Sequence, residues 1–124
     1  KKSNYNRNMK VPATNITEVI KALVEEFISG INFHPKSAEG INGGLCDNFA
    51  HAVTIQIPGA EALWGDGMDE EAWDMPYNWV EYHAAYHCFV RFKNRYYDSE
   101  EPEGVDHPMK LPYYQRELRH FNSR

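Results

Sequence analysis

Three side chains of this sequence have the types that nucleophilic catalysis needs: Cys46, His87 and Asp98. Cys46 directly follows a glycine-rich approach and opens a stretch with helical periodicity. At a helix N-terminus, the unpaired N–H groups and the positive end of the helix dipole favour a thiolate, the nucleophilic form of cysteine. A histidine close to the thiol takes and returns its proton, and a carboxylate orients the imidazole. The three residues therefore predict attack by Cys46 on a carbonyl carbon.

The histidine and the aspartate can meet only if one turn has the right length. Residues 79–92 and 95–99 are rich in aromatic and β-branched side chains and are predicted to form a β-hairpin. With a two-residue turn at positions 93–94, Asp98 lies diagonally across from His87 on the same face of the sheet. A three-residue turn would put the aspartate on the opposite face. The catalytic hypothesis therefore requires the two-residue turn.

Two helices are predicted ahead of the hairpin. The first spans about residues 15–28, carries one apolar stripe, and is capped by Asn15 or Thr17. The second spans about residues 45–56 and carries the candidate nucleophile at its start. Its last residues alternate and are β-branched, so a short strand over 53–57 is the alternative.

The segments outside the two helices and the hairpin are predicted to be mostly irregular. Residues 1–14 are polar and predict a flexible lead-in, whereas residues 60–78 are rich in acid, glycine and tryptophan and predict a surface insertion or lid. The tail is loop-like up to a short helix over 113–121. A length of 124 residues fits one domain over 1–124.

Composition narrows the classes of partner. The formal net charge is -5 and there is no dense basic run, which argues against nucleic acid. No apolar run approaches the ~20 residues that cross a bilayer, so no membrane partner is expected. Two cysteines are too few for a disulfide scaffold and fit free thiols in a reducing, cytoplasmic setting, although a bridge between them is possible on counting alone. Nothing in the chain calls for a cofactor.

A zinc site is the main rival chemistry, because His83, His87 and Cys88 are close in sequence. In the predicted strand, however, the two imidazoles would lie ~13 Å apart at 3.3 Å per residue. We therefore predict no metal.

The oxyanion of an acyl-transfer reaction needs hydrogen-bond donors. The backbone N–H of Cys46 is one, and Asn42 or Asn32 in the preceding loop is a candidate for the second. Trp79, near the acidic segment, is a candidate for lining the substrate cleft.

The order of these motifs resembles the papain-like cysteine hydrolases. The resemblance rests on a glycine pair running into Cys46, on Phe49 and Ala50 after it, and on His87 and Asp98 on successive strands. It is closest to the transglutaminase-like and NlpC/P60-like branches. This implies an α+β fold in which the nucleophile begins a helix packed on an antiparallel sheet that carries the other two residues.

Three functions follow from this resemblance and from the residues. The first is hydrolysis of an amide, peptide or isopeptide bond in a peptide or protein substrate, through a thioester on Cys46. The second is a transglutaminase or glutamine deamidase reaction on the same triad. The third is a catalytically inactive module that binds a protein through the acidic segment 60–78. The oligomeric state stays open.

Overall fold

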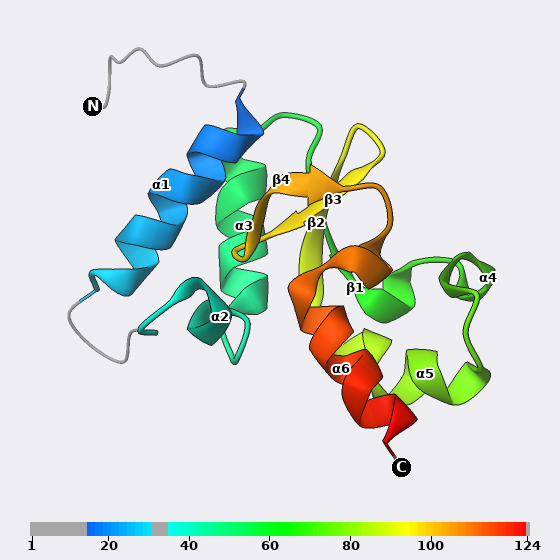
Figure 1. The fold of residues 1–124 in the computed structure, drawn as a ribbon. Helices are drawn as coiled ribbons and strands as arrows, with labels where there is room; N and C mark the ends of the chain where they lie inside the picture. Colours follow the sequence, from blue (N-terminus) through cyan, green and yellow to red (C-terminus); the bar gives the residue numbers. More distant parts are fainter. Residues whose placement is uncertain (1–14, 31–34, 124) are drawn as a thin grey trace.

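The protein is described by a computed structural model that covers residues 15–30 and 35–123 (Figure 1). The predicted lead-in 1–14 and Asn32 lie outside these residues. The fold is α+β, as the sequence predicts, and is built on a four-stranded antiparallel sheet in the order β1-β2-β3-β4. The strands are β1 (Glu61–Trp64), β2 (Cys88–Phe92), β3 (Arg95–Asp98) and β4 (Glu101–Val105).

Helices cover both faces of this sheet. The α-helices are α1 (Ile16–Ile28), α2 (Ala38–Ile41), α3 (Cys46–Gln56), α4 (Glu70–Trp73), α5 (Tyr77–Tyr82) and α6 (Pro112–Asn122). Single 3-10 turns form η1 (Gly65–Gly67), η2 (Ala84–Tyr86) and η3 (Pro108–Lys110). No helix in the described part of the chain is both long and apolar enough to span a bilayer.

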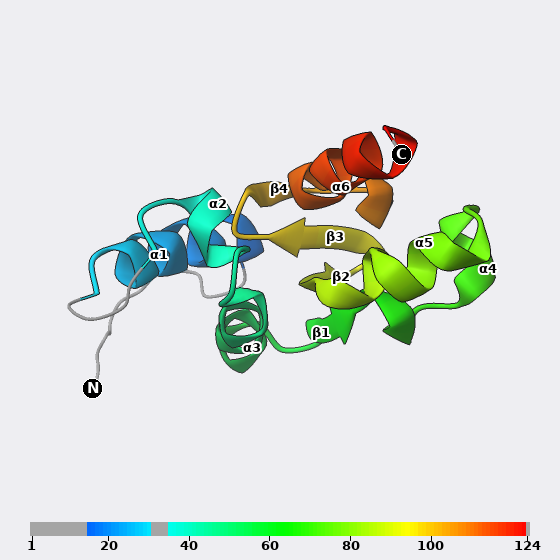
Figure 2. The ribbon, with the colours of Figure 1, turned by 90° about the horizontal axis from the view of Figure 1, so that it is seen from below.

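The sheet separates two hydrophobic cores. Figures 1 and 2 show α1 and α3 on one side of the strands, and α4, α5 and α6 on the other. The α3-side core contains Ile20, Leu23, Phe49, Val53, Val90 and Tyr97. The α6-side core is more aromatic and contains Trp73, Trp79, Phe89, Leu111 and Tyr114. Alternation along β2 explains the split, because Phe89 and Val90 point to opposite faces.

The two predicted helices ahead of the hairpin are confirmed. Helix α1 begins after Asn15, whose side chain accepts a hydrogen bond from the N–H of Glu18 at 3.2 Å, so Asn15 rather than Thr17 is the cap. Helix α3 continues to its end, where the N–H of Ile57 still bonds to the carbonyl of Val53 at 2.9 Å. The alternative of a strand over 53–57 is therefore wrong.

The turn that the catalytic hypothesis requires is present. Lys93 and Asn94 have φ angles of 51° and 64°, and Phe92 pairs directly with Arg95. Two successive positive φ angles define a type I′ turn, whose twist suits a two-residue hairpin. The same pairing register, continued along the strands, brings Asp98 diagonally across from His87.

Three parts of the sequence prediction are wrong in detail. Only residues from Cys88 onward form the first strand of the hairpin, because residues 79–82 belong to α5 and residues 84–86 to η2. Aromatic and β-branched content alone does not separate a short buried helix from a strand. The segment 60–78 is also more than a surface insertion: it supplies β1 and buries Trp73 to 1% exposure. The tail adds β4 before its predicted helix, and the proline and glycine in that strand are tolerated at the sheet edge.

Candidate active site

The histidine and the aspartate form a buried pair at one end of the sheet. Nε2 of His87 lies 2.9 Å from Oδ2 of Asp98, and the side chains are 0% and 2% exposed. The second carboxylate oxygen, Oδ1 of Asp98, accepts the N–H of Glu100 at 2.9 Å. Both oxygens of Asp98 are therefore engaged, which fixes the orientation of the imidazole.

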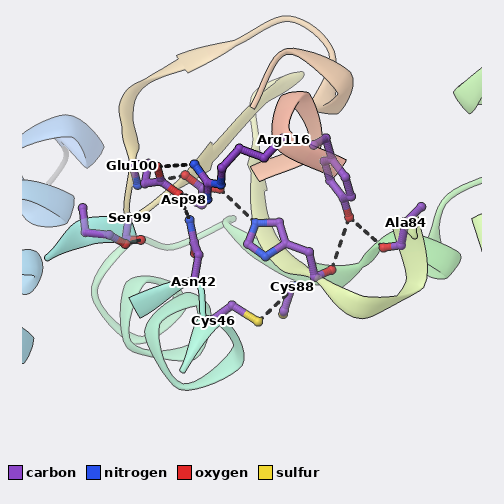
Figure 3. A network of polar contacts seen from close by, with 11 residues as sticks. Asn42, Cys46, Ala84, Cys88, Asp98, Ser99, Glu100 and Arg116 are labelled. Carbon is purple, nitrogen blue, oxygen red and sulfur yellow. Dashed lines mark hydrogen bonds and ion pairs between the residues drawn. The ribbon is translucent and has the colours of Figure 1, made fainter. Parts of the chain in front are cut away.

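Cys46 stands at the first position of α3, as predicted. Its sulfur accepts a hydrogen bond from the backbone N–H of Cys88 at 3.4 Å (Figure 3). Leu45, the residue before the helix, provides no side-chain cap. The first N–H groups of a helix have no partner within the helix. They can therefore stabilise negative charge on the sulfur or on a bound oxyanion.

Both the Asp98 carboxylate and the Cys46 thiol affect the pKa of His87. Burial lowers the pKa of His87, but the Asp98 carboxylate hydrogen-bonded to it and the neighbouring Cys46 thiol outweigh this effect and raise the pKa above its ordinary value of 6.5. Since Nε2 is held by Asp98, Nδ1 is the nitrogen left for the thiol. Nδ1 is buried, and it makes no hydrogen bond to any of the described residues. Such contacts are often loose in the free enzyme and tighten when substrate binds.

The second cysteine has a different environment. Burial raises the pKa of Cys88 to about 12, with smaller contributions from the negative charges of Cys46 and Asp47. Its side chain packs in the α3-side core. Both cysteines are free thiols. Cys88 is therefore a neutral core residue at neutral pH, and only its backbone N–H takes part in the site.

Tyr113, near the start of α6, covers the imidazole. Its ring stacks on that of His87 with centroids 4.1 Å apart and planes at 15°. Burial raises the pKa of the Tyr113 phenol to about 12, so it stays neutral. The ring excludes water from one face of His87 and restricts its rotation.

Removing this ring should change the titration of the histidine. In a Cys46→Ala background, which removes the neighbouring thiol, Tyr113→Ala should raise the pKa of His87, because burial is the largest influence on this pKa and lowers it. The measurement is an NMR pH titration of the His87 ring. Tyr113→Phe keeps the ring and should leave the pKa unchanged. Equal pKa values in the alanine and phenylalanine variants would contradict this role.

A charged network supports the loop ahead of Cys46. Glu100 receives two hydrogen bonds from the guanidinium of Arg116, at 2.9 and 2.7 Å, and one from Nδ2 of Asn42 at 2.9 Å (Figure 3). Burial raises the pKa of Glu100, but these bonds outweigh it and lower the pKa overall. The carboxylate is therefore ionised, and it ties the loop carrying Asn42 to β3 and α6.

Hydrogen bonds also hold the backbone at His87. The carbonyl of His87 accepts the N–H of Gly65 at 3.1 Å. The hydroxyl of Tyr114 donates to the carbonyl of Ala84 at 2.7 Å and lies 3.5 Å from that of His87. The start of η1 and helix α6 thus hold the backbone from which the histidine side chain projects.

An open cleft of about 280 Å³ reaches Cys46. It is lined by Asn42, Gly43, Gly44, Cys46, Asp47, Trp64, Tyr86 and Tyr113. Its aromatic side includes Trp64, 42% exposed, and Tyr86, 65% exposed. The Cys46 side chain is therefore reached through a cleft with one aromatic and one glycine-rich side.

Of the three residues predicted to contact the substrate, only one is found in the cleft. Asn42 does line the cleft, with one of its amide hydrogens committed to Glu100. Asn32 lies outside the described residues. Trp79 is a wrong prediction for the cleft: it is 0% exposed and packs against Trp73 and His83 in the α6-side core.

The two histidines that suggested a zinc site have separate partners. Nδ1 of His83 lies 2.9 Å from Oε1 of Glu117, whereas His87 pairs with Asp98. Within residues 15–30 and 35–123, no group of three His, Cys, Asp or Glu side chains is arranged to hold a metal ion.

Sequence reasoning missed three residues of the site: Tyr113, Glu100 and Arg116. Each comes from the tail, where the predicted elements gave no reason to expect contact with the loop before Cys46. The amphipathic spacing of residues 113–121 predicts a helix but not the element against which it packs.

Comparisons with protein-family models, with curated proteins and with solved structures give no match for this chain. Inferences about its chemistry therefore depend on the residues and their geometry.

Proposed function

We propose that the protein is a papain-like cysteine hydrolase. More narrowly, we propose that it cleaves an amide, peptide or isopeptide bond through a thioester on Cys46. The observation that carries the proposal is the buried hydrogen bond between Nε2 of His87 and Asp98, which leaves Nδ1 buried without a partner among the described residues. The effect of the Cys46 thiol on the pKa of His87 agrees with it. A buried histidine with a purely structural role would not require both a carboxylate and a thiol as neighbours.

The chemistry follows from these groups. The Cys46 thiolate attacks the carbonyl carbon, and the oxyanion that forms accepts a hydrogen bond from the N–H of Cys46 at the start of α3. Protonated His87 gives its proton to the leaving amine, and the thioester remains. Water then attacks the thioester while His87 accepts a proton, and Cys46 is released. Asp98 stabilises the charged imidazole during both steps.

Two related reactions use the same groups. A transglutaminase passes the acyl group to an amine, and a glutamine deamidase releases ammonia from a side-chain amide. Product analysis by mass spectrometry separates these from hydrolysis of a backbone or isopeptide bond. A protein-binding module that lacks catalysis would use neither the thiol nor the imidazole.

Alkylation by iodoacetamide at pH 7 tests the proposal. A thiol with a pKa of about 12 is ionised to only ~1 part in 10⁵ at that pH, so Cys88 should react extremely slowly. We expect Cys46 to react at least ~100-fold faster than Cys88, because it lies at a helix start beside His87. Mass spectrometry of the digested protein gives both rates.

A Cys46→Ala variant is the control, and it should show no fast labelling and no amide hydrolysis. A Cys88→Ala variant should keep both. Equal rates for the two thiols of the native folded protein, or hydrolysis that survives in Cys46→Ala, would contradict the proposed function.

A further inference from the structure

We propose that the cleft at Cys46 selects a peptide with a basic side chain, lysine or arginine, next to the bond that is cleaved. This inference rests on the proposed hydrolase function. It concerns the side of the cleft formed by Asp47, Trp64 and Tyr86, none of which takes part in the proposed bond-breaking steps.

The first support is an unpaired carboxylate. Asp47 directly follows the nucleophile in α3, lines the cleft, and is only partly buried. Among the described residues, its carboxylate has no hydrogen-bond or ion-pair partner. A carboxylate that neither caps a neighbouring group nor pairs with a cation is available to a ligand.

The second support is the pair of exposed aromatic rings. Trp64 ends β1 and pairs with Cys88, whose N–H touches the sulfur of Cys46. Tyr86 is two residues before that contact, at the end of η2. Exposed tryptophan and tyrosine faces attract cations through their π-systems and cover the apolar stem of a lysine or arginine side chain.

The third support is the sign of charge around the cleft. None of its eight lining residues is a lysine, arginine or histidine. The cation of the supporting network, Arg116, is already bound by Glu100, and Glu39 lies 3.8 Å from it. A second hollow, bordered like the cleft by a residue of η2, is lined in part by the carboxylates of Asp66, Glu70 and Glu81. A basic peptide would therefore approach through a negative potential, and an acidic peptide would be repelled.

Charged thiol reagents test the potential without any turnover. The probes are the trimethylammonium-ethyl, sulfonato-ethyl and methyl methanethiosulfonates, which are cationic, anionic and neutral. Relative to the neutral reagent, Cys46 should react faster with the cation than with the anion. Asp47→Asn should reduce this cation-to-anion ratio roughly fivefold, because it removes the nearest unpaired charge. Normalising to the neutral reagent corrects for any change in thiol reactivity.

Asp69→Asn is the matched control, since this exposed residue lines neither the cleft nor the hollow of Asp66, Glu70 and Glu81. It should leave the ratio within experimental error. Trp64→Leu should also lower the ratio, by roughly threefold, if the ring contributes a cation–π contact.

Fluorogenic peptide amides then test the substrate. One residue on the acyl side of the scissile bond is varied between lysine, norleucine and glutamate, where norleucine keeps the stem without the charge. We expect kcat/KM to fall in that order, and Asp47→Asn to bring lysine close to norleucine.

Equal kcat/KM for lysine and glutamate, or a charged-reagent ratio that Asp47→Asn leaves unchanged, would overturn this inference and leave the hydrolase proposal intact. Acceleration only on adding a free amine, without preference among peptides, would also overturn it. Absence of hydrolysis of all the peptides, with a slow thiol at Cys46, would instead contradict the hydrolase proposal, while the reagent ratio would still decide the preference for a cation.

Discussion

His87→Gln should lower the kcat for amide hydrolysis by a factor on the order of 10² to 10⁴, the usual contribution of a positioned general acid and base. The glutamine fills part of the space and can hydrogen-bond to Asp98, but it neither accepts the proton of Cys46 nor protonates the leaving amine. The measurement is the rate of cleavage of a fluorogenic peptide amide. Iodoacetamide alkylation of Cys46 should also slow at neutral pH, because the thiolate loses its imidazolium partner.

The chain offers a closely matched control in His83→Gln. His83 is also buried, also pairs with a carboxylate at 2.9 Å, and also stacks on an aromatic ring, that of Trp79 with planes at 15°. Both variants replace an imidazole–carboxylate pair with at most a weaker amide–carboxylate hydrogen bond, so both should lose stability. Only His87→Gln should lose catalysis. Turnover of His87→Gln within tenfold of the native protein, or an equal loss in His83→Gln, would show that the imidazole of His87 is structural.

Gly65→Ala should destabilise the fold by about 3 kcal/mol or more, the range of severe overpacking. A Cβ atom at Gly65 would overlap the backbone carbonyl of Ala84 and lie 2.8 Å from the hydroxyl of Tyr114. Backbone atoms cannot move aside as a flexible side chain does, so η2 would have to separate from η1, which begins at Gly65. Because the N–H of Gly65 also bonds to the carbonyl of His87, the site should be distorted as well. Urea unfolding gives the stability, and peptide cleavage gives the activity.

Gly67→Ala, two residues further along, is the comparison. There a Cβ would meet only the Cδ2 atom of Leu63, at 3.9 Å, which is ordinary contact. The unfolding midpoint should therefore change little. Similar unfolding midpoints for the two alanine variants would mean that Gly65 of η1 and Ala84 of η2 are not packed as described.

The pairing of His87 with Asp98 could be predicted because it depends on local rules. A two-residue turn and the alternation of side chains along a strand are enough to bring His87 and Asp98 to one face. The position of Cys46 follows from a helix pattern after a glycine pair. Each of these features is determined within a dozen residues, where the sequence is most informative.

The cleft could not be predicted, because it depends on how separate elements pack. Trp79 and Trp64 are the same residue type in similar surroundings, yet one is buried and the other lines the cleft. The difference arises because residues 77–82 coil into a helix against α6 instead of extending β2. Likewise, the pairing of Glu100 with Arg116 joins the turn between β3 and β4 to α6. No local pattern in the sequence indicates this contact.

The turn at Lys93 and Asn94 has a consequence for how this chain can evolve. Neither residue touches the cleft, so their side chains are open to exchange, with glycine and aspartate the replacements that best accept positive φ. The number of residues in the turn, in contrast, cannot change. Inserting or deleting one would shift the pairing by one position and carry Asp98 to the face opposite His87. Among descendants of this protein that keep the proposed reaction, we expect substitutions at these two positions but no single-residue insertions or deletions there.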